Sequence, residues 1–302
     1  MSRRGWVLFA AMCLLWGIPY LLIKIAVAGV SVPVLVFART AVGALVLLPL
    51  AVRPGAWPVL RAHWLPLLGF AALEIIGPWA LLSDAERHLT SSLTGLLIAA
   101  VPIIGVVVGR TLGDTERLGT RRWLGLGAGL AGVVVLAAPH LGGDSGWALG
   151  EVLLVAVGYA TAPVIAARRL TGVPNLLMTA SCLAVAALVY TGPAIATWPT
   201  PPPEPRVLLA LGALALVCTA LAFVVFFELI REVGPARALV FTYVNPAVAV
   251  AAGVLLLGEP LTPTVLGAFA LILGGSVLAT SRPRPERPVR AARGGRSRSA
   301  PG

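Results

Sequence analysis

The stretch that decides the fold is residues 244–278, which read VNPAVAVAAGVLLLGEPLTPTVLGAFALILGGSVL. An apolar run begins at an Asn-Pro pair, ends at a Gly-Glu-Pro turn and is followed by a second, glycine-rich apolar run. Residues 101–136, VPIIGVVVGRTLGDTERLGTRRWLGLGAGLAGVVVL, have the same layout. The proline, the Gly-acid pair and two glycines recur at spacings of 142 to 145 residues. One pair of predicted helices is therefore written twice, and such a repeat constrains the fold more than any local signal.

Composition indicates that the chain lies in a bilayer. Of its 302 residues, 58% are hydrophobic and only 12% are charged, and the mean hydropathy is +0.94. A soluble domain carries about 25% charged residues. Many apolar runs reach the roughly 20 residues that cross the hydrocarbon core. The predicted fold class is an all-α membrane protein, and the lipid bilayer is its first partner.

Ten transmembrane helices are predicted, joined by short connections that hold most of the proline, glycine and charge. Several tryptophans fall at the predicted helix ends, where their rings suit the membrane interface. No connection is long enough to form a soluble domain. The predicted spans are residues 6–28, 33–52, 64–83, 90–112, 122–139, 147–168, 174–197, 206–230, 235–257 and 262–280.

Arginine and lysine in the loops predict the orientation, because cytoplasmic loops are enriched in them. If the N-terminus is cytoplasmic, the inner side holds 19 basic residues and the outer side holds two, Arg87 and Arg206. Both termini are therefore expected in the cytoplasm. Ten spans agree with this orientation, since an odd number would place the termini on opposite sides.

This topology makes the repeat an inverted one. Because five spans are an odd number, the second copy must enter the membrane from the opposite side. We expect one five-helix repeat over residues 1–140 and a second, inverted one over 141–280. Residues 281–302, rich in Arg, Pro, Gly and Ser, are expected to form a disordered basic cytoplasmic tail. Inverted repeats are typical of secondary transporters.

The net charge of +11 does not indicate a nucleic-acid partner, because seven of the 23 basic residues follow residue 281 and most others lie in short loops. A nucleic-acid binder would gather them on one folded face. Cys13, Cys182 and Cys218 lie in apolar runs without the spacing of metal ligands. We expect no metal, no cofactor and no nucleic acid.

Several short signatures add a family resemblance. They are Trp16-Gly17, Arg39 in FARTAVGALVLL, Pro102 with Leu112-Gly113-Asp114, Gly150-Glu151 with Tyr159 and Arg168-Arg169, and above all residues 226–278. Over about residues 6–280 the chain resembles the EamA-type members of the drug/metabolite transporter superfamily, which have two five-helix domains. The resemblance implies a secondary carrier of small metabolites or drugs, often an exporter, with a central cavity.

The chain departs from that family pattern at four places. Asp114 stands where the family usually has Glu, and an insertion follows near residues 115–122. Both changes fall in a predicted cytoplasmic turn, where they are expected to matter little. Glu74 and Glu228, inside predicted spans, do not belong to the pattern.

Two charges inside predicted spans support the most specific hypothesis, because a charge at bilayer depth needs a partner or a function. Arg39 and Glu74 are expected at depths that differ by roughly 4–5 Å at 1.5 Å per residue, so we expect an intramembrane ion pair. That pair serves the structure alone, or Glu74 faces the cavity as a proton site or a ligand for a cationic group. Lys24, Glu151 and Glu228 are expected to be structural, the last paired with an arginine one turn on.

Pro102 and Pro246 correspond in the two halves. A proline inside a span frees a backbone carbonyl and kinks the helix, which membrane proteins accept where neighbours or cavity water satisfy the group. We expect both to be kinks or hinges beside a central site. A bend that serves only packing is the alternative.

Aromatic and hydroxyl side chains at depth suit a mostly apolar cavity with a few orienting polar groups. Packing in the core or against lipid explains each of them singly. The predicted lining consists of Trp16, Tyr20, Glu74, Thr94, Tyr159, Thr219, Phe223, Tyr243 and Asn245. The glycines of residues 125–132 and 267–275 are expected to serve close helix packing. They leave both a monomer and a homodimer open.

We expect a secondary-active transporter in a bacterial inner membrane, working by alternating access. The family resemblance implies export of a small neutral or zwitterionic metabolite, amino acid or drug, and the few fixed charges argue against a strongly anionic substrate. Protons are a candidate coupling ion. The sequence holds no HExxH, GxSxG or GxxxxGK[ST] motif, so we do not expect an enzyme or an ATP-driven pump. An integral membrane enzyme and a non-transporting scaffold or sensor remain the alternatives.

Overall fold

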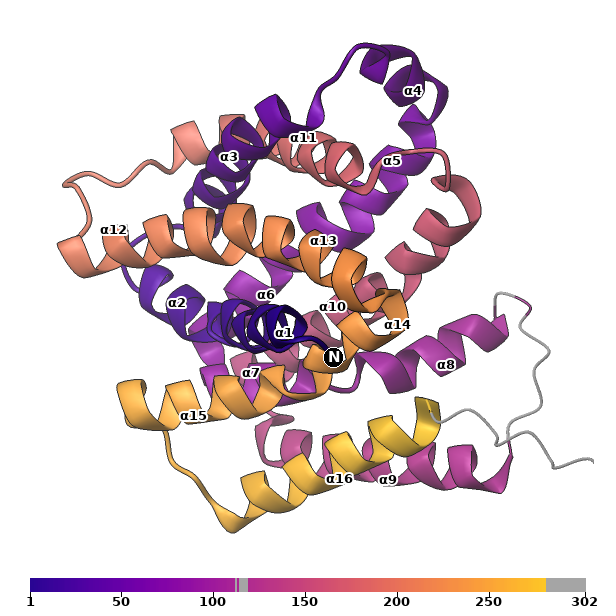
Figure 1. The fold of residues 1–302 in the computed structure, drawn as a ribbon. Coiled ribbons are helices and arrows are strands. Elements are labelled where there is room, and N and C mark those ends of the chain that lie inside the picture. Colours follow the sequence, from indigo (N-terminus) through magenta and orange to yellow (C-terminus); the bar gives the residue numbers. More distant parts are fainter. Residues whose placement is uncertain (112, 114–118, 281–302) are drawn as a thin grey trace, which may run out of the picture.

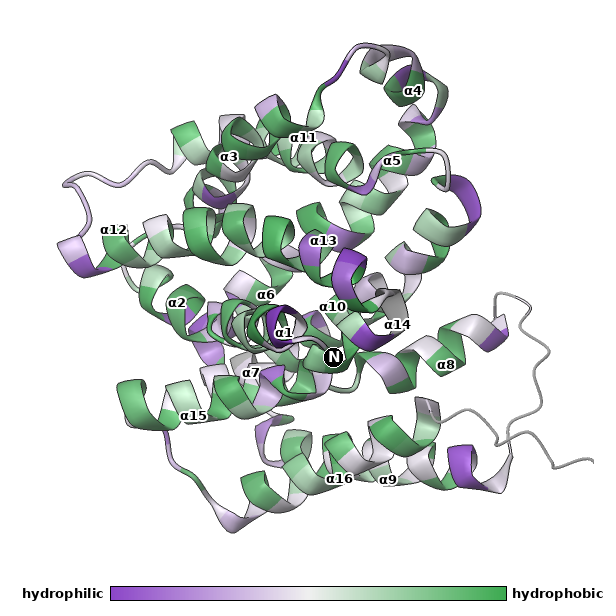
Figure 2. Cartoon of the chain, in the orientation of Figure 1, coloured by the Kyte–Doolittle hydropathy of each residue, from purple (hydrophilic) through white to green (hydrophobic). Residues whose placement is uncertain are grey.

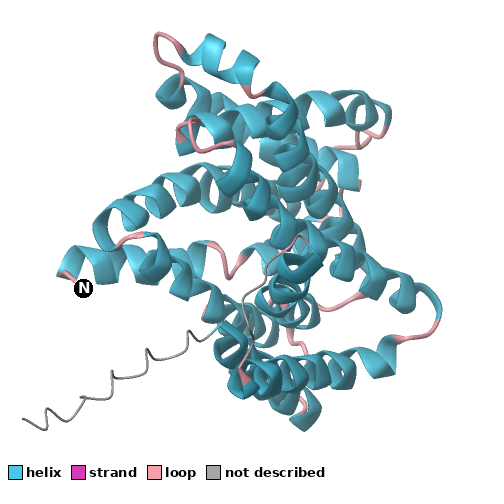
Figure 3. Cartoon of the chain, turned by 90° about the vertical axis from the view of Figure 1, so that its right-hand side faces the viewer, coloured by secondary structure: helices cyan, strands magenta, loops and turns pink. Residues whose placement is uncertain are grey.

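The structure is a computed structural model that describes residues 1–302 except 112, 114–118 and 281–302. The described residues form helices joined by short connections (Figures 1 and 3). The predictions for Asp114 and for the tail 281–302 fall outside them. In the first half the elements are α1 (Arg3–Leu15), α2 (Pro19–Ala26), α3 (Val32–Ala51), α4 (Ala56–Ala62), α5 (Trp64–Ala71), η1 (Ala72–Ile76), α6 (Gly77–His88), α7 (Ser91–Ile98), α8 (Val101–Thr111) and α9 (Thr120–Ala137).

The second half continues with a comparable series. Its elements are η2 (Ala138–His140), α10 (Gly143–Arg169), α11 (Asn175–Ala196), α12 (Pro205–Gly212), η3 (Ala213–Leu221), α13 (Ala222–Val233), α14 (Pro235–Ala238), η4 (Leu239–Tyr243), α15 (Asn245–Leu257) and α16 (Pro263–Thr280). Helices α3 and α11 lie side by side at one edge of the bundle, and α9 and α16 at the other (Figure 1).

Nine helices in the described part of the chain are long and apolar enough to cross a membrane. Their bounds follow the predicted spans, except that the third runs on to His88 instead of ending at residue 83 and that the ninth predicted span, residues 235–257, is broken. There α14 and η4 precede a helix of only 13 residues, Asn245–Leu257, which is shorter than a full span. Pro246 at the second position of α15 explains the break, because proline is accepted in the first turn of a helix and not within it.

The fourth span of the first half breaks in the same way. Helix α7 ends at Ile98 and α8 begins at Val101, so Pro102 again occupies the second helical position. Both predicted prolines therefore coincide with breaks between helices. Whether the breaks act as hinges is a separate question of function.

The helices present apolar side chains to the outside of the bundle. Leu188, Leu209 and Leu255 are at least 75% exposed, and hydrophilic residues gather at helix ends and turns (Figure 2). Outward leucines are costly in water and favourable in hydrocarbon. The surface is that of a membrane protein, whose backbone groups are satisfied within helices.

The two ends of the bundle differ in their polar contacts. At the Arg4 end, Arg4 Nη2 lies 2.8 Å from Glu228 Oε2 on α13, and Arg231 Nη1 lies 2.6 Å from Glu228 Oε1. The predicted helical pair of Glu228 with the arginine one turn on is confirmed. At the Glu259 end, Lys24 of α2 and Glu259 of the α15–α16 turn contact the α6–α7 region.

The buried apolar residues form separate clusters. The largest joins α2, α3, α5, α6, α10, α11 and η3, with Leu183 and Leu214 fully buried in it. Helices α1 and α13 share a second cluster with η4 around Phe241. Helices α8, α9 and α16 share another around Ile103.

Glycines let α9 and α16 approach closely. A Cβ at Gly275 would collide with the backbone of Gly125 and Gly129 across the contact. By contrast, a Cβ at Gly274 would meet no atom within 4 Å. The predicted packing role therefore holds for Gly125, Gly129, Gly132 and Gly275, which lie on the shared face.

We predict that Gly275→Ala lowers stability and that its neighbour Gly274→Ala does not. Overpacking against a backbone that cannot yield costs about 1–3 kcal/mol, whereas alanine in an open helical position is neutral or slightly favourable. Thermal unfolding of the two variants in detergent checks this. Equal melting temperatures would contradict the glycine contact.

Candidate functional site

The third span of each half contains a widened, π-helical segment in its middle. These segments are η1 (Ala72–Ile76) and η3 (Ala213–Leu221). In η3 the Thr219 hydroxyl donates to the carbonyl of Leu214, five residues back, at 2.8 Å. Such turns are rare in proteins overall, and those that occur are often found at functional sites. Two of them at corresponding places direct attention to the centre of the bundle.

Arg39 on α3 joins the two halves at this centre. Its side chain is buried, and its Nε donates to Thr219 Oγ1 at 2.9 Å. The guanidinium carbon lies 3.7 Å from the centroid of the Trp79 ring on α6. A charge that stacks on an indole and donates to a hydroxyl is stabilised without a carboxylate partner.

The predicted ion pair between Arg39 and Glu74 is wrong. Arg39 turns to Thr219 and Trp79, while Glu74 Oε2 is buried without a hydrogen-bond partner. The third span runs on to His88 instead of ending at residue 83, so Glu74 lies deeper than the sequence indicated. It interacts electrostatically with Tyr159 on α10 and with Cys182 on α11.

Tyr20 and Tyr159 complete the polar part of the centre. Each interacts electrostatically with Arg39, and Tyr20 also interacts with Tyr159. Both tyrosines and Glu74 are only partly buried, although their helices lie in the middle of the bundle. We call Tyr20, Arg39, Glu74, Trp79 and Tyr159 the central polar group.

An aromatic cluster adjoins this group on the side of the Arg4 end. Trp16, at the break between α1 and α2, lies with its ring centroid 5.5 Å from Phe223 and 5.0 Å from Phe226. Its centroid is 5.3 Å from that of Phe241 on η4. Faces and edges of aromatic rings suit an apolar or cationic ligand part.

Three residues of the predicted lining are engaged in hydrogen bonds within the protein. Thr94 is fully buried, and its hydroxyl donates to the carbonyl of Thr90 at 3.0 Å. Thr219 is also fully buried and holds Arg39. The hydroxyl of Tyr243 lies 2.7 Å from that of Thr280, on the exposed surface.

Asn245 stands at the break that begins α15, with Oδ1 buried and without a hydrogen-bond partner. Trp16, Tyr20, Glu74, Tyr159 and Phe223 therefore gather at the centre, and Asn245 adds an unpartnered amide oxygen beside a helix break.

Glu259 makes the most extensive polar contact between the halves. Its Oε1 accepts from Ser91 N at 2.8 Å and from Ser91 Oγ at 2.9 Å. Its Oε2 accepts from Ser92 N at 2.9 Å and from Ser92 Oγ at 2.5 Å. A carboxylate is well placed there, because the first N–H groups of a helix lack internal partners and carry the positive end of its dipole. We call this set of four hydrogen bonds the Glu259 cap.

The sequence predicted only a turn residue at Glu259. A glycine on α15 admits the carboxylate, since a Cβ at Gly253 would collide with Glu259 Oε2. The available signal was Thr90-Ser91-Ser92, which reads as a helix start with open donors. Nothing local identified the acid that would reach it from 167 residues away.

Glu86 is a second residue that the sequence reasoning passed over. It falls outside the predicted span 64–83, yet it lies on α6 and is fully buried. The Lys24 ammonium donates to the backbone carbonyls of Glu86 at 2.5 Å and Leu89 at 2.8 Å, as expected of a cation at a helix C-terminus.

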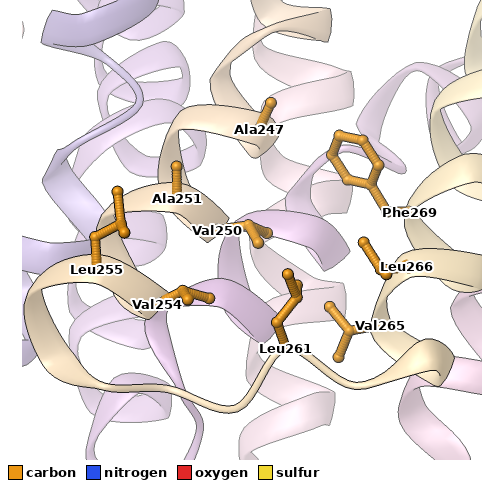
Figure 4. A pocket seen from close by; sticks show the side chains of 9 residues that line it. All are labelled: Ala247, Val250, Ala251, Val254, Leu255, Leu261, Val265, Leu266 and Phe269. Carbon is orange, nitrogen blue, oxygen red and sulfur yellow. The ribbon is translucent and has the colours of Figure 1, made fainter.

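An apolar groove lies apart from the central polar group. It has a volume of about 370 Å³ between α15 and α16, and side chains from both helices point into it (Figure 4). Every lining residue is apolar: Ala247, Val250, Ala251, Val254, Leu255, Leu261, Val265, Leu266 and Phe269. The groove has no group to orient a polar ligand.

The EamA-like transporter family matches the chain twice, over residues 3–138 and 146–281. The protein belongs to this family. Its two halves are two copies of the family's domain, as the repeat in the sequence predicted. The family resemblance drawn from the short signatures is thereby confirmed.

Named relatives of this EamA-like protein are transporters. It is 30% identical to the "Uncharacterized inner membrane transporter YedA" of Escherichia coli K12, over 89% of this chain and 88% of the relative. It is 26% identical to the "Uncharacterized transporter YvbV" of Bacillus subtilis, over 95% and 94%. A solved structure titled "Crystal structure of protein" shares the fold, with a TM-score of 0.65 and 22% identity over 92% of this chain and 98% of the other.

We predict that Glu259→Gln in this EamA-like protein lowers the free energy of unfolding by about 1–3 kcal/mol. The Gln side chain keeps only one acceptor oxygen, so the N–H and hydroxyl donors of one of the two serines lose their acceptor. Glu228→Gln is the matched control, because exposed ion pairs contribute about 0–1 kcal/mol. Chemical denaturation in detergent measures both. Equal losses would rule out a special contribution of the Glu259 cap.

We predict that Arg39→Lys is not a conservative change. Lysine has no planar group to stack on Trp79 while reaching Thr219, so stability should fall by about 1–2 kcal/mol. Arg231→Lys, on the exposed surface, should change it by no more than about 0.5 kcal/mol. Thermal unfolding followed by tryptophan fluorescence compares the two, and an unaffected Arg39→Lys protein would contradict the stacking.

Proposed function

We propose that the protein is a secondary-active exporter of a small neutral or zwitterionic metabolite, amino acid or drug. It works by alternating access to the central polar group. The observation that carries the proposal is the central position of this group in a chain whose two halves each match a transporter domain. Groups that bridge two repeats at the middle of a bundle are where secondary transporters bind substrate.

Inversion of the halves is supported by the ends at which they begin. Helix α1 starts at the Arg4 end, where Arg4 pairs with Glu228. Helix α10 starts at the Glu259 end, where Ala148 and Leu149 pack in one cluster with Leu89. The first helices of the two copies thus run from opposite ends, as inverted repeats require.

The charge distribution supports the orientation. The basic loop residues gather on the side that the sequence analysis assigns to the cytoplasm, which includes Arg4 and Arg231. The Arg4 end is then cytoplasmic and the Glu259 end faces outward. A relative named as an inner membrane transporter supports a bacterial plasma membrane.

The chemistry of the centre supports the substrate class. Arg39 provides one buried cation for a carboxylate or carbonyl group, and Glu74 provides one carboxyl with an unpartnered oxygen for an ammonium or hydroxyl group. The aromatic cluster around Trp16 accepts an apolar part. One group of each sign suits a neutral or zwitterionic molecule better than a strongly anionic one.

The packing supports a conformation that is closed at the Glu259 end. The Glu259 cap joins the halves there. At the Arg4 end, the cluster around Phe241 and the cluster around Ile103 are separate. Partial exposure of Trp16, Glu74 and Tyr159 agrees with access from that side.

The test is counterflow in proteoliposomes against a panel of amino acids, neutral metabolites and drugs, with and without a pH gradient. We expect saturable exchange of a subset of the panel. Liposomes that hold a Gly275→Leu protein, whose α9–α16 contact cannot form, provide the background. Thermal unfolding curves establish that the reconstituted protein is folded. If that protein exchanges no compound above the background, the proposed function is overturned.

We predict that Glu74→Gln lowers the exchange rate about tenfold, equivalent to about 1.4 kcal/mol, and flattens its pH dependence. The physical reason is loss of the only carboxylate in the central polar group. Glu204→Gln, on an exposed loop, should leave both unchanged. Full exchange with an unaltered pH profile would remove Glu74 from the site.

A further inference from the structure

Glu86 is a buried acid to which the proposed function gives no role. Its side chain is 0% exposed, and both carboxylate oxygens are buried without a hydrogen-bond partner. An ionised carboxylate in this position loses its hydration and gains no hydrogen bond that replaces it, which costs several kcal/mol.

The cations near Glu86 make no direct contact with its carboxylate. Lys24 acts on Glu86 electrostatically, but its ammonium donates to the carbonyls of Glu86 and Leu89. Arg39 donates to Thr219 and stacks on Trp79. Neither neutralises the carboxylate by direct contact.

The remaining charged and titratable groups around Glu86 add no positive charge. Glu259, from the α15–α16 turn, acts on it electrostatically as a second acid. Tyr20 interacts with it from α2. On α6 itself, Arg87 lies 3.6 Å from Asp84, with which Glu151 of α10 also interacts.

We propose that Glu86 is a proton-binding site that controls the Glu259 cap. In the conformation seen here Glu86 holds a proton and is neutral, so that the Glu259 carboxylate can occupy the start of α7 beside it. When Glu86 releases the proton, its fully buried carboxylate repels the partly buried carboxylate of Glu259, which is held at the start of the next helix. Repulsion and desolvation then favour separation of the α15–α16 turn from α7, which opens the Glu259 end.

The surroundings give the proton a short route. A hollow of about 160 Å³ lies next to Glu86 at the Glu259 end and is lined by Lys24, Val27, Ala28, Glu86 and Arg87. Glu86 therefore borders a hollow at that end of the bundle. A proton can reach it from that side without crossing the central polar group.

The sign of the pH dependence follows from this arrangement. The closed conformation binds one more proton than the open one, so low pH favours closure and rising pH favours opening. Within the titrating range, the ratio of open to closed molecules should change by up to about tenfold per pH unit. A cap that merely served stability would show no such dependence.

The experiment measures the Glu259 end directly. Spin labels at His88→Cys and Pro260→Cys, both exposed, report the distance between the α6–α7 turn and the α15–α16 turn in the full chain in nanodiscs. The three native cysteines are buried, and the unsubstituted chain serves as the labelling control. We expect the long-distance population to grow from about pH 5 to about pH 8, the range over which most proteins stay folded.

Glu86→Gln should abolish this pH dependence and hold the short distance, because glutamine imitates the protonated acid. Glu204→Gln, an exposed carboxyl, should keep the wild-type response. Infrared difference spectra between the two pH values provide a second readout. They should contain a protonated-carboxyl stretch that is absent in Glu86→Gln, whatever that variant does to the distances.

An undiminished pH response in Glu86→Gln, with the carboxyl stretch retained, would overturn the proposal. A response to sodium ions at constant pH would do the same, since it would assign the site to a metal cation. The proposal rests on the alternating access inferred above, but the measurement needs no substrate. A pH-dependent distance in a protein that exchanges nothing would reject the transport function and leave the proton site standing.

Discussion

The structure depends on one constraint, that a charge removed from water must be satisfied by the protein itself. Arg39 meets it by spanning the two halves: the hydroxyl of Thr219 belongs to one half and the ring of Trp79 to the other. Glu259 meets it by accepting four hydrogen bonds at the start of α7. Each charge therefore holds together elements that lie far apart in the sequence, because no partner was near at hand.

The backbone is arranged to make these contacts possible. The π-helical segment that includes Thr219 turns its hydroxyl inward, where it both donates to Leu214 and accepts from Arg39. The breaks before Pro102 and Pro246 give each half a helix start within the bundle. At such breaks a membrane protein exposes backbone groups away from lipid, and those groups can hold ligands or capping acids.

What the sequence could predict were features with a local cause. Span positions follow from apolar runs, the breaks from Pro102 and Pro246, and the pair of Glu228 with Arg231 from helical spacing. The partner of Arg39 was predicted wrongly, because a helix that continues to His88 changes the depth of every residue on it. Glu86 and the Glu259 cap depend on which faces of α6, α7 and α15 meet, and no periodicity in a single sequence specifies that.

The two ends of the bundle are held by contacts of unequal strength. At the Arg4 end the pair of Arg4 with Glu228 is exposed, and such pairs contribute about 0–1 kcal/mol. At the Glu259 end, partly buried hydrogen bonds to a carboxylate contribute more, about 1.5–3 kcal/mol for each bond to a charged group. A carrier needs two conformations within a few kcal/mol of each other. The stronger end must therefore be weakened at some step of the cycle, and a buried acid beside Glu259 is placed where the loss of one proton does that.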